Sequence, residues 1–511
     1  MADSVAYGKR LVKGSTIVFT AFVLSGFIGL LLRMFLARSL TVAEYGLFYA
    51  VFVLISFFEL FRGLGFDTAL VKYIPEFVVK RQFSKIKSSI DLVLLLRIGI
   101  GFLIMSVFFI FPGQISSAVF KTTAAVPLLL ILGIWFILMG FSTLTNTFRG
   151  FQNMPVYASL KFLDNFLVFF LALLMVGYLG LGVVGAAYAY LFTAFVIAVL
   201  GFFALRWKYP KIFRRPQMTR SLVKKLSAFA FPVFLTSVVG LVIGYMDTLM
   251  LTMFRSLQEV GYYQTARPMS DMLFSVAGSV LIVFFPMVSE LWAKHEKKLL
   301  KNMVRFLMKF SFILAIPVVL IFVAFPETII RIFFGADYVA GAVALQILSV
   351  MTIFHLMTGI LNSTLAGIGK PAVTTAITSV MAVFNFIFNL VLIPVYGIVG
   401  AAFTSLASYM VGTVLLFYYT RKFVGFSFPA APFAKSMAGG ILTLLFIFGL
   451  KSLLALPPVY MVAVIGILSF AFYASWALAT KAVTRDDLNL IARIVPVPNR
   501  IMKVIIKLAR H

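Results

Sequence analysis

Four arginines and six acids lie within or at the edge of stretches of the chain that are otherwise long and apolar, and eight of these residues are candidates for function. The eight are four arginines and four acids, namely Arg33, Arg62, Arg97 and Arg267 together with Glu59, Asp67, Asp247 and Asp271. A charge at the centre of a membrane-spanning helix costs roughly 2.5–3.5 kcal/mol, so such charges face a bundle interior or a water-filled cavity. Guanidinium groups suit phosphate, because they donate paired hydrogen bonds. These residue types predict a polar path between the membrane-spanning helices for a charged substrate.

The spacing of these charges separates paired from unpaired groups. Glu59 lies three residues before Arg62, and Arg267 lies four residues before Asp271. Each pair can neutralise itself on one helix face, and a purely structural ion pair is the alternative to a functional role. Asp247 has no basic neighbour on its own helix, so we expect it to bind a proton or a cation such as Na⁺. Glu59, Asp67 and Asp271 are further candidates for ion coupling.

Depth in the helix distinguishes the four arginines. Arg33 and Arg267 lie in the outer third of their helices, where the alternative is that they extend to lipid headgroups. Arg62 and Arg97 lie deeper, and we expect an interior role for them. All four are candidates for binding substrate. Two amides, Asn385 and Asn389, lie four residues apart and are expected to hydrogen-bond across helices.

Composition excludes several classes of function. Of 511 residues, 62% are hydrophobic and only 12% are charged, which predicts a polytopic membrane protein and no soluble domain of ordinary composition. Cysteine is absent and there are three histidines without ligand spacing, so we expect no thiol chemistry, structural metal or cofactor. The net charge of +28 reflects the basic residues in the loops on one side of the membrane, as described below. It is therefore not evidence that the protein binds nucleic acid.

Apolar runs of about 20 residues, the length needed to cross a bilayer, define the elements that position these charges. The first run, from Ser15 to Leu32, is too long for the core of a signal peptide. There are fourteen predicted spans, at approximately 15–37, 46–70, 89–111, 124–147, 158–178, 182–204, 228–252, 262–288, 304–325, 341–366, 372–394, 397–420, 434–455 and 458–480. The predicted fold class is therefore an all-α polytopic membrane protein.

Lysine and arginine collect in alternate loops. The basic segments are 9–13, 72–87, 206–225, 294–309, 421–435 and the tail, whereas the other side holds only Arg38, Lys121, Arg255, Arg331 and Lys451. The positive-inside rule therefore places both termini and the basic loops in the cytoplasm, against the anionic lipids of the inner leaflet. In the tail, 481–511, apolar and basic residues alternate with helical period, which predicts an amphipathic helix on that leaflet.

An internal repeat divides the chain. Gly182-Val-Val-Gly-Ala-Ala recurs at Gly397-Ile-Val-Gly-Ala-Ala, and Arg38-Ser-Leu recurs at Arg255-Ser-Leu, at offsets of 215 and 217. Six spans per repeat give both halves the same orientation, as in transporters built from parallel repeats. We predict an N-terminal lobe of 1–205 (helices 1–6), a basic cytoplasmic linker of 206–226, a C-terminal lobe of 227–422 (helices 7–12) and two further helices in 423–480.

Three stretches resemble a known family. Leu36-Ala-Arg-Ser-Leu-Thr-Val-Ala-Glu-Tyr-Gly-Leu-Phe48, Gly65-Phe-Asp-Thr-Ala-Leu-Val-Lys-Tyr-Ile74 and Arg149-Gly-Phe-Gln152 are similar to the polysaccharide-transporter branch of the multidrug/oligosaccharidyl-lipid/polysaccharide exporter superfamily. The resemblance implies a V-shaped, two-lobe, alternating-access flippase in the cytoplasmic membrane. Its implied cargo is a lipid-linked oligosaccharide for surface polysaccharide or glycan synthesis, and enzymes of glycan assembly are its implied partners. Peptidoglycan-precursor flippases carry an Arg-Asp pair on helix 1, where this chain has Leu32-Arg33, so another glycan is favoured.

Two alternatives remain open at this point. A cation-coupled multidrug exporter of the same fold would prefer a cavity dominated by carboxylates or aromatic faces. A membrane glycosyltransferase or polymerase would need positioned acids or bases on sizeable outer loops. The predicted outer loops are short and their acids have no obvious partner, so we expect no enzyme.

Overall fold

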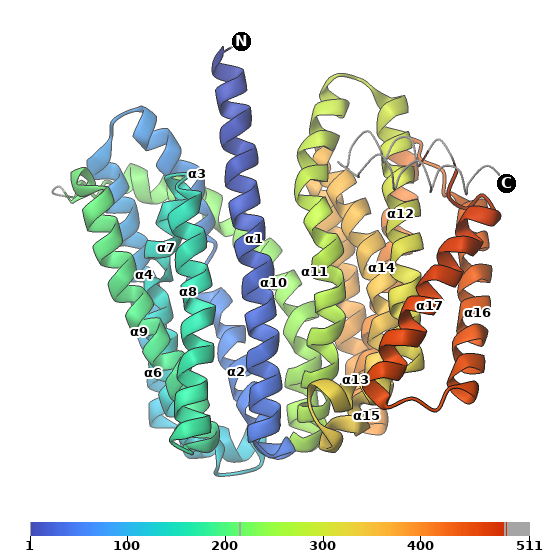
Figure 1. Cartoon of the computed structure of the whole chain (residues 1–511). Helices are drawn as coiled ribbons and strands as arrows, with labels where there is room; N and C mark the ends of the chain where they lie inside the picture. The colour runs from blue at the N-terminus through green and yellow to red at the C-terminus, as the bar shows by residue number, and fades with distance from the viewer. Residues whose placement is uncertain (1, 214–215, 485–486, 488–511) are drawn as a thin grey trace. The chain divides into compact units, whose positions relative to one another are not determined.

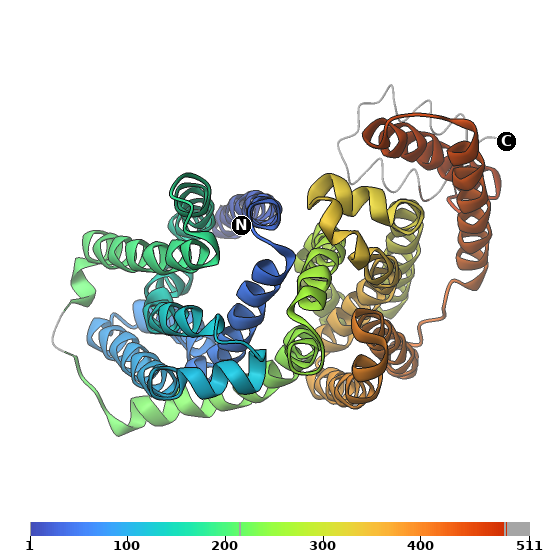
Figure 2. The ribbon, with the colours of Figure 1, turned by 90° about the horizontal axis from the view of Figure 1, so that it is seen from below.

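The computed structural model describes residues 2–213, 216–484 and 487, and every regular element in that part of the chain is helical (Figure 1). The helices are α1 (Ala2–Ser39), α2 (Val42–Gly63), α3 (Phe66–Val79), α4 (Phe83–Ile110), α5 (Pro112–Ile115), α6 (Ala125–Leu138), α7 (Ser142–Gly150), α8 (Met154–Ala172), α9 (Gly182–Lys208), α10 (Arg220–Phe254), α11 (Leu257–Ala293), α12 (Lys297–Ala324), α13 (Pro326–Phe333), α14 (Ala342–Gly367), α15 (Pro371–Val424), α16 (Ala430–Leu453) and α17 (Pro458–Ala479). Short 3-10 or π turns are η1 (Ser116–Phe120), η2 (Met139–Phe141), η3 (Leu173–Tyr178), η4 (Pro210–Ile212) and η5 (Ala336–Gly341). Figure 2 shows many of the helices nearly end-on, as in a membrane bundle.

Eleven helical stretches in the described chain are long and apolar enough to cross a membrane. Two further long helices, α1 and α11, occupy the positions of the predicted first and eighth spans. Helix α15 has 54 residues and covers the predicted eleventh and twelfth spans. The all-α, multi-pass fold class is therefore confirmed. From residue 488 onward, the predicted amphipathic tail lies outside the described residues.

The two predicted spans within α15 meet at Gly397. This residue has φ 54° and ψ −131°, a backbone conformation that glycine adopts readily and other residues avoid. A Cβ at Gly397 would also collide with the carboxylate of Glu259. Pro394, three residues earlier, lacks the N–H that an uninterrupted helix would use. The repeated glycine motif at 397 thus marks the sharp turn between two spans.

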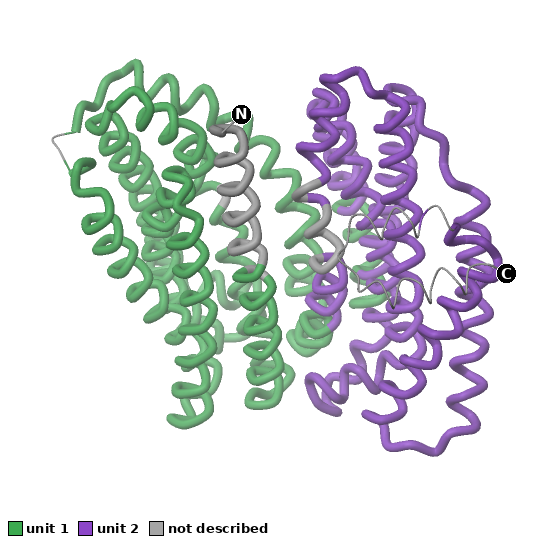
Figure 3. The backbone as a smooth tube through the Cα atoms, turned by 45° about the horizontal axis from the view of Figure 1, so that its top comes forward, with its two compact units in different colours: residues 1–265, 386–401 green, residues 266–385, 402–511 purple. Residues whose placement is uncertain are grey.

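Contacts divide the chain into two compact units. Unit 1 contains 1–265 and 386–401, and unit 2 contains 266–385 and 402–511 (Figure 3). Helix α10, which begins the predicted C-terminal lobe, lies in unit 1. The repeat-based boundaries, 1–205 and 227–422, describe sequence similarity, and they remain a prediction about which parts move together.

Helix α10 joins unit 1 because its first turns enter a core there. Leu222, Leu226 and Ala230 are buried against residues of α3, α4 and α7. Gly65, with φ 77°, lies so close to the backbone of Ala230 that a Cβ would collide with the Ala230 carbonyl. Burying apolar side chains gives roughly 25 cal/mol per Å², so this core fixes α10 to α3.

The linker of 206–226 also packs on unit 1 over its first part. The Tyr209 ring stacks on Phe151 with ring centroids 3.9 Å apart, and the Asn153 side-chain amide donates to the Tyr209 hydroxyl at 3.1 Å. Ile212 is buried in the same core as α10. These contacts tie residues 209–212 to the ends of α7 and α8.

Helices α2 and α11 cross closely at their first turns, and the crossing is reciprocal. A Cβ on Gly46 would collide with the carbonyl of Leu257, and a Cβ on Gly261 would meet the carbonyl of Val42 at 2.5 Å. Gly46 and Gly261 are 215 positions apart, as are Val42 and Leu257. Small residues permit such close backbone approach in membrane proteins. The offset equals that of the glycine motifs, so the crossing relates equivalent positions of the two repeats.

In unit 2, α12 packs against α14, α16 and α17. Phe312 of α12 stacks on Phe433 of α16 with centroids 3.7 Å apart. Gly439 of α16 packs against the ring of Trp476 on α17, whose indole N–H donates to the carbonyl of Lys435 at 2.9 Å. The last two spans therefore form a layer on α12.

Candidate functional site

Four of the predicted charged residues meet inside unit 1, and we call them the charge cluster: Glu59, Arg62, Asp67 and Arg97. Arg62 pairs with Glu59 on α2, as the sequence spacing predicts. Arg97 of α4 also pairs with Glu59, with 2.6 Å between Nη2 and Oε1, and it pairs with Asp67 of α3. Glu59 is therefore shared by two arginines, which its spacing to Arg62 alone does not predict.

A break between α2 and α3 allows this arrangement. Leu64 and Gly65 both have positive φ, 43° and 77°, so the chain leaves the path of α2 before Asp67. Two acids from successive helices can then reach one guanidinium on α4. Thr143 of α7 completes the contact, since its hydroxyl lies 3.2 Å from both the Arg97 guanidinium and the Asp67 carboxylate.

Burial is unequal within the charge cluster. Arg62 and Arg97 are 0% and 1% exposed, whereas the side chains of Glu59 and Asp67 are 40% and 27% exposed. Arg62 also donates to the carbonyl of Phe136 and lies over its ring, 4.5 Å from the centroid. In the part of the chain that the structure describes, the Nε atoms of both arginines have no hydrogen-bond acceptor. The acids thus form the accessible face of the cluster, and the arginines lie behind them.

Arg33 makes its described contacts within unit 1. Its guanidinium lies over the Tyr49 ring, 4.2 Å from the centroid. One Nη1 group approaches two oxygens of Gln264 on α11, the main-chain carbonyl at 3.3 Å and the side-chain Oε1 at 3.4 Å. Arg33 therefore belongs to the interior of unit 1.

Asp247 is a buried carboxylate on α10 with 1% of its surface exposed. It accepts a hydrogen bond from the Tyr263 hydroxyl at 2.7 Å and another from the Asn389 amide at 2.7 Å. The cross-helix hydrogen bond predicted for Asn389 is therefore confirmed. This bond also attaches the segment 386–401 of α15 to unit 1.

Arg267 and Asp271 lie in unit 2, where they form the predicted pair along α11. The Arg267 Nε atom is 3.3 Å from each carboxylate oxygen. Arg267 is mostly buried and Asp271 is about half exposed. The acid is again the more accessible partner.

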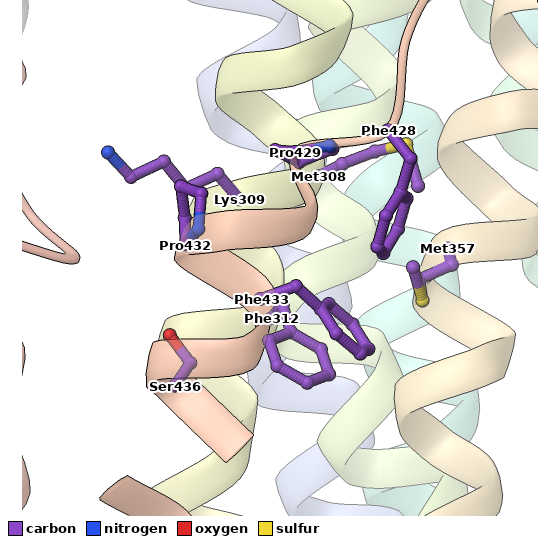
Figure 4. A pocket seen from close by; sticks show the side chains of 9 residues that line it. All are labelled: Met308, Lys309, Phe312, Met357, Phe428, Pro429, Pro432, Phe433 and Ser436. Atoms are coloured by element: carbon purple, nitrogen blue, oxygen red, sulfur yellow. The ribbon is translucent and has the colours of Figure 1, made fainter. Parts of the chain in front are cut away.

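Two small pockets lie elsewhere. One, in unit 2, is lined by α12 and α16 side chains such as Phe312 and Phe433, with Lys309 at its edge (Figure 4). The other, in unit 1, contains Asp164 and Lys161 of α8. None of the eight predicted site residues lines either pocket. The charge cluster, Arg33 and Asp247 therefore remain the candidate site of unit 1.

The sequence pattern did not identify four polar residues that contact the site: Tyr263, Gln264, Thr143 and Thr248. The Thr248 hydroxyl accepts a hydrogen bond from the Gln264 amide. Each of the four residues is uncharged, and the available signal was only that each is a polar group inside an apolar span. Gln264 lies three residues before Arg267 on α11, close to a charge that the pattern did identify.

Solved structures share the fold at low sequence identity. The lipid II flippase MurJ, in an inward-closed conformation, matches with a TM-score of 0.70 and 17% identity, over 90% of this chain and 98% of that chain. A multidrug resistance MATE family transporter of the MOP superfamily, in an inward-facing conformation, matches with a TM-score of 0.64 and 17% identity, over 80% of this chain and 94% of that chain. The protein therefore has the two-lobe fold of these transporters.

Two archaeal relatives are similar in sequence. A membrane protein of Methanocaldococcus jannaschii is 28% identical over 96% of this chain and all of its own length. The probable low-salt glycan biosynthesis flippase Agl15 of Haloferax volcanii is 24% identical over 51% of this chain and 56% of its own length.

Two family models match the chain. The MatE model matches residues 232–391. The model described as polysaccharide biosynthesis protein matches residues 11–292, more than half of the chain, so this multi-pass membrane protein belongs to the polysaccharide biosynthesis protein family.

Proposed function

We propose that the protein is a flippase that moves a lipid-linked, polyprenyl-phosphate oligosaccharide across the cytoplasmic membrane by alternating access, for the synthesis of a surface glycan. Membership of the polysaccharide biosynthesis family supports this function. So do the names of two Haloferax volcanii relatives, a probable glycan biosynthesis flippase and a probable flippase. The proposed role is transport and not enzymatic catalysis.

The observation that carries the proposal is the shared carboxylate of the charge cluster. Glu59 is accessible and accepts from two buried arginines, Arg62 and Arg97. A phosphate oxygen is also an anionic acceptor, and the guanidinium fork suits phosphate as well as it suits a carboxylate. In our proposal the headgroup phosphate displaces Glu59 and is held by the two arginines. The Nε donors that lack an acceptor in the described chain support this role.

Arg33 in unit 1 and Arg267 in unit 2 are further proposed substrate contacts. Both carry a cation within a predicted span, and Arg33 lies in the same unit as the charge cluster. We expect them to contact the diphosphate or the first sugar during passage. Asp271, exposed beside Arg267, would act as a displaceable counter-ion in the way proposed for Glu59.

Asp247 is the proposed coupling group. It is a buried carboxylate held by two neutral donors, Tyr263 and Asn389. An ionised carboxylate is costly to bury, so binding of H⁺ or Na⁺ at this point would stabilise the buried state. The cation gradient would then drive the change between the two faces, with Glu59 and Asp67 as secondary sites for protons.

The proposed location is the cytoplasmic membrane, with both termini and the basic loops on the cytoplasmic side. The excess of lysine and arginine on that side supports this topology. Anionic lipids of the inner leaflet and enzymes of glycan assembly are the proposed neighbours.

Substitution of the two buried arginines tests the proposal. Arg62→Lys and Arg97→Lys should retain partial transport, whereas Arg→Ala should retain little, because lysine keeps the charge but loses the bidentate fork. Transport is measured in proteoliposomes that contain a fluorescent polyprenyl-diphosphate sugar. The measured quantity is the fraction of the fluorescence that external dithionite quenches, because lipid that is flipped to the outer leaflet becomes accessible to it. Arg331→Ala, at an exposed position on α13, is the matched control. Full transport by both alanine variants would exclude this role.

A multidrug exporter is the second candidate, and a specific observation favours it. The accessible groups of the charge cluster are the acids Glu59 and Asp67, which suit a cationic cargo better than an anionic one. Expression in a drug-sensitive host discriminates the two functions. Resistance to lipophilic cations that is lost in Glu59→Gln, without flipping of the labelled lipid, would support the exporter.

A further inference from the structure

Gln264 contacts both Arg33, a proposed substrate contact, and the residue next to Asp247, the proposed coupling group. Its side-chain Oε1 accepts from Arg33 at 3.4 Å, and its Nε2 donates to the Thr248 hydroxyl at 2.8 Å. Thr248 is the residue next to Asp247 on α10, and Tyr263, next to Gln264 on α11, donates to Asp247. Gln264 is buried, with 5% of its surface exposed. One amide group therefore connects the position of Arg33 with the contact between α10 and α11.

The contact between α10 and α11 is also the contact that holds Asp247. Two neighbouring residues of α11, Tyr263 and Gln264, bond two neighbouring residues of α10, Asp247 and Thr248. A shift of the first turns of α11 along α10 would break both bonds together. Ligand binding at Arg33 and ligand binding at Asp247 would therefore both affect the position of α11 relative to α10. Two sites that act on one such element are physically coupled.

The contacts of Arg33 can respond to a ligand. Both of its approaches to Gln264, at 3.3 and 3.4 Å, are long for an N–H···O hydrogen bond. A phosphate would form shorter, charge-assisted bonds and would draw the guanidinium away. Gln264 would then lose the cation that orients its amide oxygen, and its bond to Thr248 would weaken.

We infer that Gln264 is the positioning residue that couples anion binding at Arg33 to cation binding near Asp247. This inference rests on the proposed function and names how its two sites communicate. Loosening of the contact between α10 and α11 also weakens the bond from Tyr263 to Asp247. Because the ionised carboxylate then loses a donor that stabilises it, an anion at Arg33 raises the affinity for the cation. By linkage, the cation raises the affinity for the anion by the same factor.

The substitution Gln264→Met removes this link and leaves the rest of both sites in place. Arg33 keeps its bond to the main-chain carbonyl of residue 264 and its position over Tyr49. Asp247 keeps its bonds from Tyr263 and Asn389. Methionine has a volume and helix propensity close to those of glutamine, so α11 is retained.

The experiment measures the binding of pyrophosphate and of Na⁺ to the full-length protein in detergent, by calorimetry, each in the presence and absence of the other. Choline chloride keeps the ionic strength constant. In the parent, saturating Na⁺ should lower the dissociation constant of pyrophosphate, so that the ratio of the constants without and with Na⁺ is at least about five, the lower end of typical coupling. In Gln264→Met the ratio should fall to about one, with each constant measured alone changed less than about twofold.

Three further variants complete the design. Thr248→Val removes the hydroxyl that accepts from Gln264, so it should abolish the coupling to the same extent. The double variant Gln264→Met/Thr248→Val should show no further loss of coupling than either single variant. Gln346→Met is the matched control, because this glutamine bonds the Val323 carbonyl in unit 2, and its coupling should equal that of the parent. Arg33→Ala should weaken pyrophosphate binding, which shows that the probe reports on this site.

Coupling that persists in Gln264→Met overturns the inference and leaves the proposed function standing. Loss of pyrophosphate or Na⁺ binding itself in Gln264→Met also overturns it, because the residue would then be part of a binding site or of the fold. A parent protein that binds neither probe contradicts the proposed function, and the inference falls with it.

Discussion

Removing the negative charge of Glu59 should destabilise the protein, because two buried arginines share that charge. In Glu59→Gln, Arg62 loses its carboxylate partner and Arg97 keeps only Asp67. A neutral amide can still accept a hydrogen bond, so the substitution tests the charge rather than the shape. Arg62 would then be a fully buried cation that has lost its ion-pair partner and lies near a second cation, Arg97.

The size of the effect follows from burial and screening. Unit charges 4 Å apart interact by about 4 kcal/mol at an effective dielectric constant of about 20. Breaking a fully buried pair costs about 3–5 kcal/mol, and an exposed pair is worth about 0–1 kcal/mol. Glu59 is 40% exposed and its partners are not, so we expect a loss of about 1–3 kcal/mol. Asp67→Asn should cost less, because Arg97 still pairs with Glu59.

The assay is thermal unfolding in one detergent at constant pH and protein concentration, with unfolding midpoints compared between variants. Adding Arg62→Met to Glu59→Gln should restore part of the lost stability, because the buried cation is then gone. Glu290→Gln is the control, since its pair with Lys294 is fully exposed and should matter little. If Glu59→Gln unfolds no earlier than Glu290→Gln, the charge cluster does not stabilise unit 1 and the reasoning is refuted.

Three further outcomes are expected. Asp247→Asn should change how transport in proteoliposomes depends on Na⁺ or pH, and an unchanged dependence on both would remove this residue from the coupling mechanism. Hydrogen bonds from Lys225 and Lys80 lower the pKa of Glu76, near the C-terminal end of α3, to about 2. The stability difference between the parent and Glu76→Gln should therefore be constant above about pH 4.5 and vanish as the pH falls towards 2, and a difference that disappears already near pH 5 would contradict the pairing. Gly46→Ala should lower the unfolding midpoint, because its Cβ collides with backbone, whereas Gly99→Ala, which has open space, should not; equal midpoints would mean that the crossing of α2 and α11 is not tightly packed.

The amino-acid sequence determined the class of protein, an all-α multi-pass membrane protein. A bilayer requires about 20 apolar residues per helix, so the spans can be read from hydropathy alone, and charges inside them stand out. Short-range pairs were equally predictable: Glu59 with Arg62, and Arg267 with Asp271, follow from residues that lie three or four apart on one helix. The predicted boundary between the spans 372–394 and 397–420 coincides with the turn at Gly397.

Only the tertiary structure decided which charges are accessible and which helices share them. Helical periodicity tells which residues lie on one face, but it does not tell which other helix covers that face. The pairing of Arg97 with Glu59 joins residues 38 apart, across the break between α2 and α3, and it places the arginines behind the acids. The link through Gln264 joins positions 231 apart and uses an uncharged side chain, which hydropathy does not distinguish from any other polar residue. Such contacts depend on how helices pack, because burial and hydrogen-bond geometry are set by groups that are distant in the chain.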